Sequence, residues 1–307
     1  GGAAVVTLAA AFPAFHAHSE VVVIVGLVAM GYGLLVRRGA REGLVTTPAQ
    51  QRLFYGGVAV MFVAASWPMH DLAERYLFSV HMVQHTVISL VIPPLLLQGT
   101  PAWMARRVLG RSVGVVRQLA RPLPALVIFN TYIVVSHIPA VVDFQLTNEP
   151  GHFVLHTTLF LTASLMWMPV LSPLPEIRRL APLAQMVYLF LQSIVPTVPA
   201  SFLTLSDSLL YRRYATFPRM WGMSAIEDQR VAGLIMKLVG GLILWAFIAV
   251  VWFKWANREQ SADRSARRLG IDRMPDDAGV LTWADVEAEL ERVGPPPAAP
   301  TNPTSSA

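Results

Sequence analysis

Long apolar runs, separated by short polar stretches, dominate the chain from residue 20 to residue 255. A run of about twenty apolar residues is long enough to cross the roughly 30 Å hydrocarbon core of a bilayer as a helix. The pattern predicts seven such helices, over residues 20–36, 53–69, 77–101, 123–142, 151–171, 182–205 and 231–255. We therefore expect an all-α fold, a polytopic integral membrane protein with seven transmembrane helices.

The connecting segments differ in character. Pro93 and Pro94 lie in the final third of the third predicted helix and are expected to kink it. Pro196 and Pro199 interrupt the sixth helix. Residues 103–121 carry five arginines among Val and Leu, a pattern typical of a helix that lies along a lipid surface. Residues 68–76 and 206–230 are predicted to be loops.

Three domains are expected: an outer N-terminal segment (1–19), the transmembrane domain (20–255) and a cytoplasmic tail (256–307). Residues 1–13 are too short to span a membrane, and a signal-peptide remnant and an interfacial segment both remain open. In the tail, residues 261–277 are expected to be loose. Thr282 to Asp285 resemble a capping box, which predicts a short amphipathic helix over 282–293, followed by a disordered end.

Composition supports a membrane protein and limits its chemistry. Hydrophobic residues make up 54% of the 307 residues and charged residues 14%, against about 25% charged in soluble domains. The chain has no cysteine, which excludes disulfides, thiolate metal sites and iron–sulfur clusters. Any metal must therefore be bound by His, Met, Asp or Glu. The net charge of +5, almost wholly from arginine, indicates orientation in a membrane rather than nucleic-acid binding.

The distribution of Lys and Arg predicts that orientation. Seven spans place the two termini on opposite sides of the membrane. With the N-terminus outside, 18 basic residues lie in the inner loops and tail and five in the outer loops. The positive-inside rule therefore favours an outer N-terminus and a cytoplasmic C-terminus. The one dissenting loop is 206–230, which carries Arg212, Arg213, Arg219 and Arg230.

Histidines then gather on the outer side. His81 and His85 are one turn apart near the outer end of the third helix, and His152 and His156 repeat this spacing in the fifth. His137 lies near the outer end of the fourth helix. Single interfacial histidines are often merely tolerated polar residues, but two such pairs and a fifth imidazole at one depth favour a metal site.

The candidate ligands fall into two ranks. The first comprises His81, His85, His137, His152 and His156, with His70 of the outer loop beside them. The second comprises His16 and His18, which could form an entry path, and Met82 and Met236. Imidazole suits copper, zinc and iron, and added thioether favours Cu(I). Two neighbours of Met236 bear on it: Lys237 must face away or be neutral if Met236 is a ligand, and Asp228 is expected to cap the seventh helix rather than bind metal.

A series of motifs points to a family. They are H-A-H-S-E at 16–20, W-P-M-H-D-L-A-E at 67–74, S-V-H-M-V-Q-H at 79–85, P-P-L-L-L-Q-G-T-P-A-W at 93–103, S-H-I-P-A at 136–140, W-M-P-V at 167–170, L-T-L-S at 203–206 and E-D-Q-R-V-A-G-L-I-M at 227–236. On these, the chain resembles the CtaG family of cytochrome c oxidase assembly proteins. The resemblance implies a role in maturing haem–copper oxidases by supplying or inserting copper on the outer side.

These observations give one main functional hypothesis and several alternatives. We expect a non-enzymatic assembly factor in the bacterial plasma membrane that binds copper, as Cu(I), and no haem. Its expected partners are cytochrome c oxidase subunits, membrane lipid and an extracytoplasmic copper donor, and no nucleic acid. The alternatives are a membrane-bound oxidoreductase with a His-ligated metal or haem, and a pure scaffold. Tyr211, Tyr214, Phe217 and Trp221 make the long outer loop the expected docking surface.

Overall fold

The computed structural model describes residues 13–268 and 283–293, and in this part the chain is 81% helical without strands. The all-α fold is therefore confirmed. The chain divides into two compact units, residues 1–253 and residues 254–307. The first is a helical bundle and contains every candidate ligand. The second holds the end of α14 and the helix α15 (Trp283–Val293), which occupies the region of the predicted amphipathic helix. Its predicted cap, Thr282, lies outside the described residues.

The helices follow one another with short connections. The first half of the chain contains α1 (Ser19–Arg41), α2 (Pro48–Ala65), α3 (Met69–Arg75), α4 (Phe78–Thr86), the π-helix η2 (Val87–Val91), α5 (Ile92–Gly99), α6 (Ala102–Leu109), the 3-10 turn η3 (Gly110–Ser112), α7 (Val113–Leu119) and α8 (Pro122–Ser136). The second half contains α9 (Pro139–Thr147), α10 (Glu149–Leu171), α11 (Pro182–Ile194), α12 (Thr197–Leu205), the 3-10 turn η4 (Arg212–Thr216), α13 (Ala225–Leu234), the π-helix η5 (Ile235–Val239) and α14 (Gly240–Arg268).

Five stretches in the described residues are long and apolar enough to cross a membrane, namely Ser19–Arg41, Phe78–Gly99, Glu149–Leu171, Pro182–Leu205 and Ala225–Ala262. Two bent pairs raise the number to seven if each is one span. These are α2 with α3, bent by 40°, and the α6–α7 stretch with α8, bent by 89°. The structure thus supports five to seven spans, and the number seven stays a prediction.

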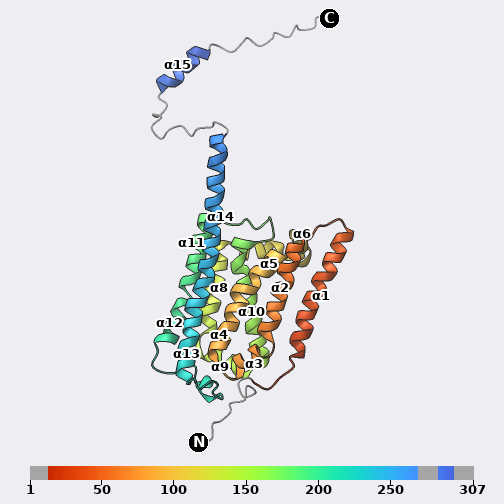
Figure 1. The fold of residues 1–307 in the computed structure, drawn as a ribbon, viewed down its shortest axis with the longest axis vertical. Coiled ribbons are helices and arrows are strands. Elements are labelled where there is room, and N and C mark those ends of the chain that lie inside the picture. The colour runs from red at the N-terminus through yellow and green to blue at the C-terminus, as the bar shows by residue number, and fades with distance from the viewer. Residues whose placement is uncertain (1–12, 269–282, 294–307) are drawn as a thin grey trace. The chain divides into compact units, whose positions relative to one another are not determined.

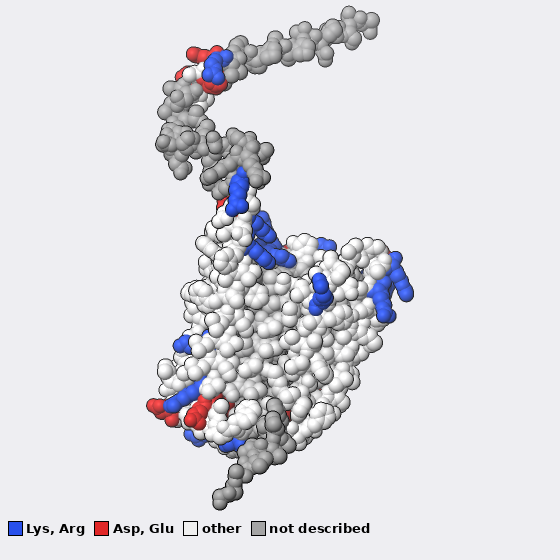
Figure 2. Space-filling view, in the orientation of Figure 1, with Lys and Arg blue, Asp and Glu red and all other residues white. Residues whose placement is uncertain are grey.

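The surface of the bundle is that of a membrane protein. Large apolar side chains point outward along its length, among them Leu123 at 70% and Leu242 at 69% exposure. Figure 2 shows Lys and Arg at one end of the bundle, both signs of charge at the other, and an almost entirely uncharged surface between. Contiguous apolar surface on this scale would aggregate in water, whereas lipid solvates it.

Three predicted boundaries are wrong. Residues 68–76, predicted to be a loop, contain the helix α3, in which Asp71 is buried and His70 and Glu74 are half-buried. The fourth helix was expected to reach residue 142, but α8 ends at Ser136, because Pro139 cannot continue it and instead begins α9. In the tail, residues 261–268 are the end of α14 and not loose chain. The rest of that segment, the predicted disordered end and residues 1–12 lie outside the described residues.

Prolines in the third span are accommodated without a sharp kink. Phe78–Gly99 remains a single span, in which the π-helix η2 immediately precedes Pro93 and Pro94. A proline lacks an N–H and its ring crowds the carbonyl one turn earlier, so a locally widened turn relieves both problems. A second π-helix, η5, interrupts the last span and contains Met236 and Lys237.

Buried polar contacts join the helices where apolar packing alone would leave them free to slide. Trp167 of α10 is fully buried and donates its indole N–H to the carbonyl of Ser89 in η2 at 3.0 Å. Tyr32 of α1 donates to the carbonyl of Gly99 at 2.9 Å. Without water to compete, such bonds fix the register of neighbouring helices.

The two ends of the bundle differ. Figure 1 shows α3 and α9 at one end, which we call the histidine end, and α6 at the other. At the α6 end, Arg107 pairs with Glu42 at 2.6 Å and Arg106 with Glu176 at 2.5 Å. The Arg107 hydrogen bond lowers the pKa of the Glu42 carboxyl below its ordinary value. These exposed pairs link α6 to the end of α1 and to the segment between α10 and α11, but contribute little stability individually.

The contact between α2 and α5 leads to a stability prediction. A Cβ on Gly99 would lie 2.5 Å from the backbone nitrogen of Phe54 and 2.7 Å from its Cα, so Gly99→Ala must push the two helices apart. We expect a loss of about 1–3 kcal/mol in the free energy of unfolding, seen as a lower Tm in detergent. Gly56→Ala in α2, where nothing lies within 4 Å, is the control and should leave Tm unchanged or raise it. Equal Tm values for both variants would contradict this close approach.

Candidate metal centre

The helix α4 presents His81 and His85 on one face, one turn apart. Its first turn is held by Asp228 of α13, whose two carboxylate oxygens accept from the N–H groups of Phe78 at 2.8 Å and Ser79 at 2.9 Å. The Asp228 side chain is fully buried. A carboxylate in this place satisfies two free donors and the positive end of the helix dipole, so it fixes where the two histidines lie.

The role predicted for Asp228 is thereby corrected. It caps a helix, as expected, but the helix is α4 and not its own. The N-terminus of α13 is capped by Ser224, which forms a capping box with Glu227. Sequence could not distinguish the two, because Asp228 and Phe78 are 150 residues apart.

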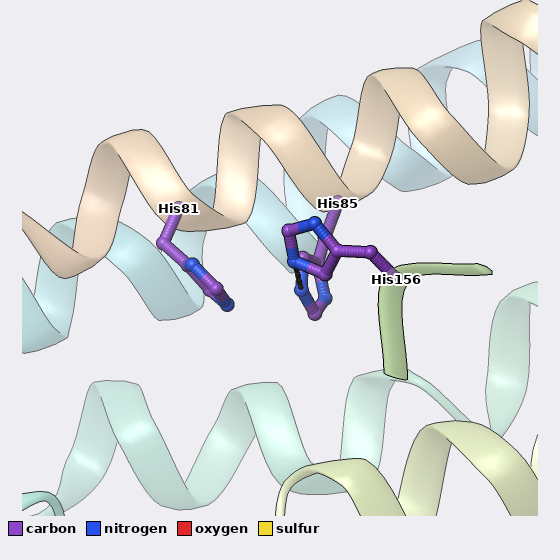
Figure 3. Close-up of side chains that lie close together, drawn as sticks. All are labelled: His81, His85 and His156. Atoms are coloured by element: carbon purple, nitrogen blue, oxygen red, sulfur yellow. Dashed lines mark hydrogen bonds between the residues drawn. The ribbon is translucent and has the colours of Figure 1, made fainter. Parts of the chain in front are cut away.

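Three imidazoles meet between α4 and α10. Figure 3 shows His156 facing His85, with His81 one turn earlier on α4. The two Nε2 atoms of His85 and His156 are 3.1 Å apart, and the ring centroid of His81 lies 4.3 Å from that of His85 and 5.5 Å from that of His156. One ligand nitrogen from each ring lies within 4.8 Å of the other two. We call His81, His85 and His156 the three-histidine group.

Several buried imidazole nitrogens near this group have no hydrogen-bond partner among the described residues. They are Nδ1 of His81, Nδ1 of His85 and Nε2 of His137. An unpaired buried polar group costs about 1–3 kcal/mol, so such groups are rare unless they have another use. Lone pairs of this kind are what a metal ion requires.

His137 shows which nitrogen is free. It follows the last residue of α8, and its Nδ1 lies 2.7 Å from the carbonyl oxygen of Ile133. A carbonyl only accepts, so Nδ1 carries the proton and the neutral ring has its lone pair on Nε2. The His137 ring centroid is 6.3 Å from that of His85, which places it beside the three-histidine group rather than within it. An imidazole held through Nδ1 in this way is typical of metal-binding histidines.

His152 connects this group to a second one. Its Nε2 lies 3.2 Å from Nδ1 of His156 and 2.9 Å from a carboxylate oxygen of Glu74. The same oxygen lies 3.1 Å from Nε2 of His70, one turn earlier in α3. His70, Glu74 and His152 place three ligand atoms within 4.8 Å of one another, and we call them the carboxylate group.

Glu74 was not among the predicted ligands. The signal that could have found it is its i,i+4 spacing from His70, which puts both on one face of a helix. The interpretation of residues 68–76 as a loop hid that spacing. Two buried glutamines were also missed: the amide nitrogen of Gln84 lies 3.2 Å from Nδ1 of His70, and that of Gln145 lies 3.4 Å from Nε2 of His81.

The N-terminal histidines lie against Asp71 of α3. Nε2 of His18 is 2.8 Å from the buried Asp71 carboxylate, and Nδ1 of the exposed His16 is 3.5 Å from it. The ring of His18 also contacts that of His70, with centroids 4.8 Å apart. All eight histidines therefore gather at the histidine end, in a series that runs from the surface at His16 to the buried His85 and His137.

The two candidate methionines lie on the other side of the three-histidine group. Met82 and Met236 line a cavity of about 60 Å³ together with His85, His137 and Lys237. Both also pack in an apolar cluster around Phe78, so each has a structural role without any ligand. Lys237 lines the same cavity and is exposed at its rim, which makes Met236 the weaker of the two as a ligand.

Part of the predicted docking surface is buried. Tyr211 and Tyr214 are 3% and 2% exposed, because both rings pack against Phe78. The Tyr211 hydroxyl donates to the carbonyl of His137 at 2.8 Å, and burial raises the pKa of Tyr214 well above its ordinary value. These two rings are therefore part of the packing around α4 and are not available on the surface. Trp221, 58% exposed, remains on the surface.

Comparisons with known proteins identify the family. A family model described as cytochrome c oxidase caa3 assembly factor (Caa3_CtaG) matches residues 30–258. Two similar proteins are the uncharacterised Mb0105 of Mycobacterium bovis and MT0111 of Mycobacterium tuberculosis, each 25% identical over 222 residues. The match covers 66% of this chain and 33% of each relative, so the chain spans about a third of the length of the curated relatives it matches. No solved structure matches the chain closely enough to count as a relative.

The matched region extends from α1 into α14 and includes both the three-histidine group and the carboxylate group. The family model thus covers well over half of the chain, and the chain belongs to the cytochrome c oxidase caa3 assembly factor (Caa3_CtaG) family.

Proposed function

We propose that the chain binds copper at the histidine end of the bundle and supports its insertion into a haem–copper oxidase. The observation that carries this proposal is the three-histidine group, in which three imidazoles converge and two of them, His81 and His85, have an unpaired Nδ1. The chain has no cysteine, so imidazole is the strongest donor it offers to a soft metal. The family assignment favours a non-catalytic role, in which the ion is cargo.

The geometry of the three-histidine group fits a small ion. Two nitrogens at about 2.0 Å from one ion in tetrahedral geometry are about 3.3 Å apart. The Nε2 atoms of His85 and His156 are 3.1 Å apart and need little movement to reach that separation. A porphyrin needs its two axial histidines on opposite faces of a wide ring, and nitrogens this close leave no room for one.

Charge favours Cu(I) for this group. Neutral imidazoles carry no formal charge, so they leave the whole charge of the ion in a buried, low-dielectric site. The electrostatic cost of burial rises with the square of the charge, so a divalent ion pays about four times the Born cost of a monovalent one. His81, His85 and His156 are best suited to the monovalent ion, with His137 and His152 within reach as additional ligands.

The series of histidines provides a route to the group. His16 and His18 lie at the surface, His70 and His152 are the next rings inward, and His152 and His156 have centroids 4.0 Å apart. On one side His85 also lines the cavity of Met82 and Met236, whose lining includes the exposed Lys237. An ion from an extracytoplasmic donor would enter along the histidines that begin at His16. It would leave beside Met82 and Met236, toward an oxidase subunit in the same membrane.

The proposed orientation is seven spans with the N-terminus outside and the C-terminus inside. It rests on the 18-to-5 distribution of basic residues and on the position of the arginine-bearing α6, which lies at the end opposite α3 and α9 (Figure 1). This orientation places the metal centre on the oxidising side of a bacterial plasma membrane, where a site without thiols is not lost to oxidation.

The first test measures bound copper. Full-length protein, purified without a polyhistidine tag, is expected to retain copper in elemental analysis and to show no Soret band. A variant with His81, His85, His152 and His156 all changed to Ala should lose that copper while still inserting and folding. His16→Ala, which removes an exposed histidine at the same end, is the control and should retain it. Unchanged copper in the quadruple variant would refute the site.

The second test addresses orientation. Because the natural chain has no cysteine, single cysteines can be labelled cleanly with an impermeant reagent on intact cells. Replacements at Ser19 and Ser208 should be labelled from outside, and those at Ser112 and Ser305 only after the membrane is opened. The reverse pattern would place every histidine on the cytoplasmic side and would end the proposal of copper delivery to the outer face.

The third test concerns the oxidase. Deleting the gene should leave oxidase subunits synthesised but poor in copper and inactive, with partial rescue by excess copper. Wild type and Glu149→Gln, an exposed change at the start of α10, should complement the deletion, and His85→Ala should not. Full oxidase activity and normal copper content in the deletion strain at limiting external copper would exclude a role in copper insertion.

A further inference from the structure

The carboxylate group differs in chemistry from the three-histidine group beside it. A single oxygen of Glu74 faces two imidazoles, with His70 Nε2 at 3.1 Å and His152 Nε2 at 2.9 Å. The two contacts come from different elements, since His70 shares α3 with Glu74 and His152 opens α10. Three ligand atoms from three side chains thus converge on one point without any contribution from His81, His85 or His156.

This group is also more accessible. The side chains of Glu74 and His70 are 24% and 20% exposed, whereas His81 is fully buried. Asp71, one turn from Glu74 on α3, binds His18 at 2.8 Å and adds a second carboxylate on the approach from the surface. Two carboxylates one turn apart on α3, the half-buried Glu74 and the buried Asp71, make this the electrostatically favourable place for a cation to stop first.

The donor set favours a divalent ion. Two imidazoles and one carboxylate suit divalent first-row metals, and among these copper(II) binds most strongly. The carboxylate offsets one of the two charges, which the neutral three-histidine group cannot do. We propose that His70, Glu74 and His152 form a second metal site that takes copper(II), separate from the Cu(I) site of His81, His85 and His156.

The two sites share a boundary at His152, whose Nε2 lies 2.9 Å from Glu74 and 3.2 Å from His156. This ring can serve one site at a time through that nitrogen. The arrangement therefore sorts copper by oxidation state, with the divalent ion held at the carboxylate and the monovalent ion further inside. The identity of the metal in this inference rests on the proposed function. The role of Glu74 as a ligand does not, because the proposed function does not require it.

A different role for Glu74 makes a different prediction. If the carboxylate only orients His152 by hydrogen bonding, its removal weakens the site that His152 serves, which is the Cu(I) site, and no copper(II) site exists. Affinities for the two ions measured separately distinguish this positioning role from ligation.

The experiment uses full-length, untagged protein in detergent, titrated with copper(II) in air and with Cu(I) under anaerobic reducing conditions. Wild type is expected to bind one ion of copper(II), whose electron paramagnetic resonance signal carries hyperfine splitting from two nitrogens. Glu74→Gln, which keeps the size of the side chain and removes its charge, should lower copper(II) affinity at least about tenfold and leave Cu(I) affinity unchanged. Glu149→Gln, an exposed change at the start of α10, is the matched control.

A double variant completes the design. His81→Ala with His85→Ala should lose Cu(I) and keep the copper(II) signal. The second site is overturned if Glu74→Gln binds copper(II) as wild type does, if it weakens Cu(I) instead, or if the double variant loses both ions. Failure of wild type to bind copper(II) while it binds Cu(I) would remove the second site alone. Failure to bind either ion would remove the proposed function as well.

Discussion

The buried carboxylate of Asp228 is the contact on which the geometry of the candidate metal centre depends. It is the only charged group that holds the first turn of α4 within the described residues, and it does so from α13, 150 positions away in sequence. The next residue, Gln229, accepts from the backbone N–H of Leu210 and so anchors the loop that covers the centre. Two adjacent side chains of α13 therefore hold both α4, which carries His81 and His85, and the loop that contains Leu210. In an apolar medium no water can substitute for these bonds, so the arrangement is rigid where it has to be.

A feature of this structure could be predicted from the sequence when the residues that determine it are close together in the chain. Apolar runs predicted the helices well, because hydropathy over twenty residues is a local property, and the i,i+4 spacing predicted that His81 faces the same way as His85. The helix α3 was missed because its polar residues resemble a loop when the partners that bury them are unknown. For the same reason Glu74 was overlooked, and Tyr211 was assigned to a surface although it packs against Phe78. Contacts between segments far apart in the chain decided each of these cases.

The π-helices η2 and η5 interrupt regular α-helix geometry close to the candidate metal centre and the cavity beside it. The π-helix η2 begins two residues after His85, and η5 contains Met236 and Lys237, which line the cavity. An extra residue in a turn changes which side chains face the interior downstream of it. In the third span it also accommodates Pro93 and Pro94, so that one irregularity serves both the backbone and the cavity beside it.

The length of α8 has a consequence for the membrane itself. Its fifteen residues span about 22 Å, which is shorter than a hydrocarbon core of roughly 30 Å. A helix of this length, starting at one interface, leaves about 8 Å of such a core unspanned beyond the break at His137. Irregular backbone at this depth survives only where protein covers it, and here the hydroxyl of Tyr211 satisfies the exposed carbonyl. The segment that carries Tyr211 therefore covers the backbone beyond the end of α8, where the helix is too short to do so itself.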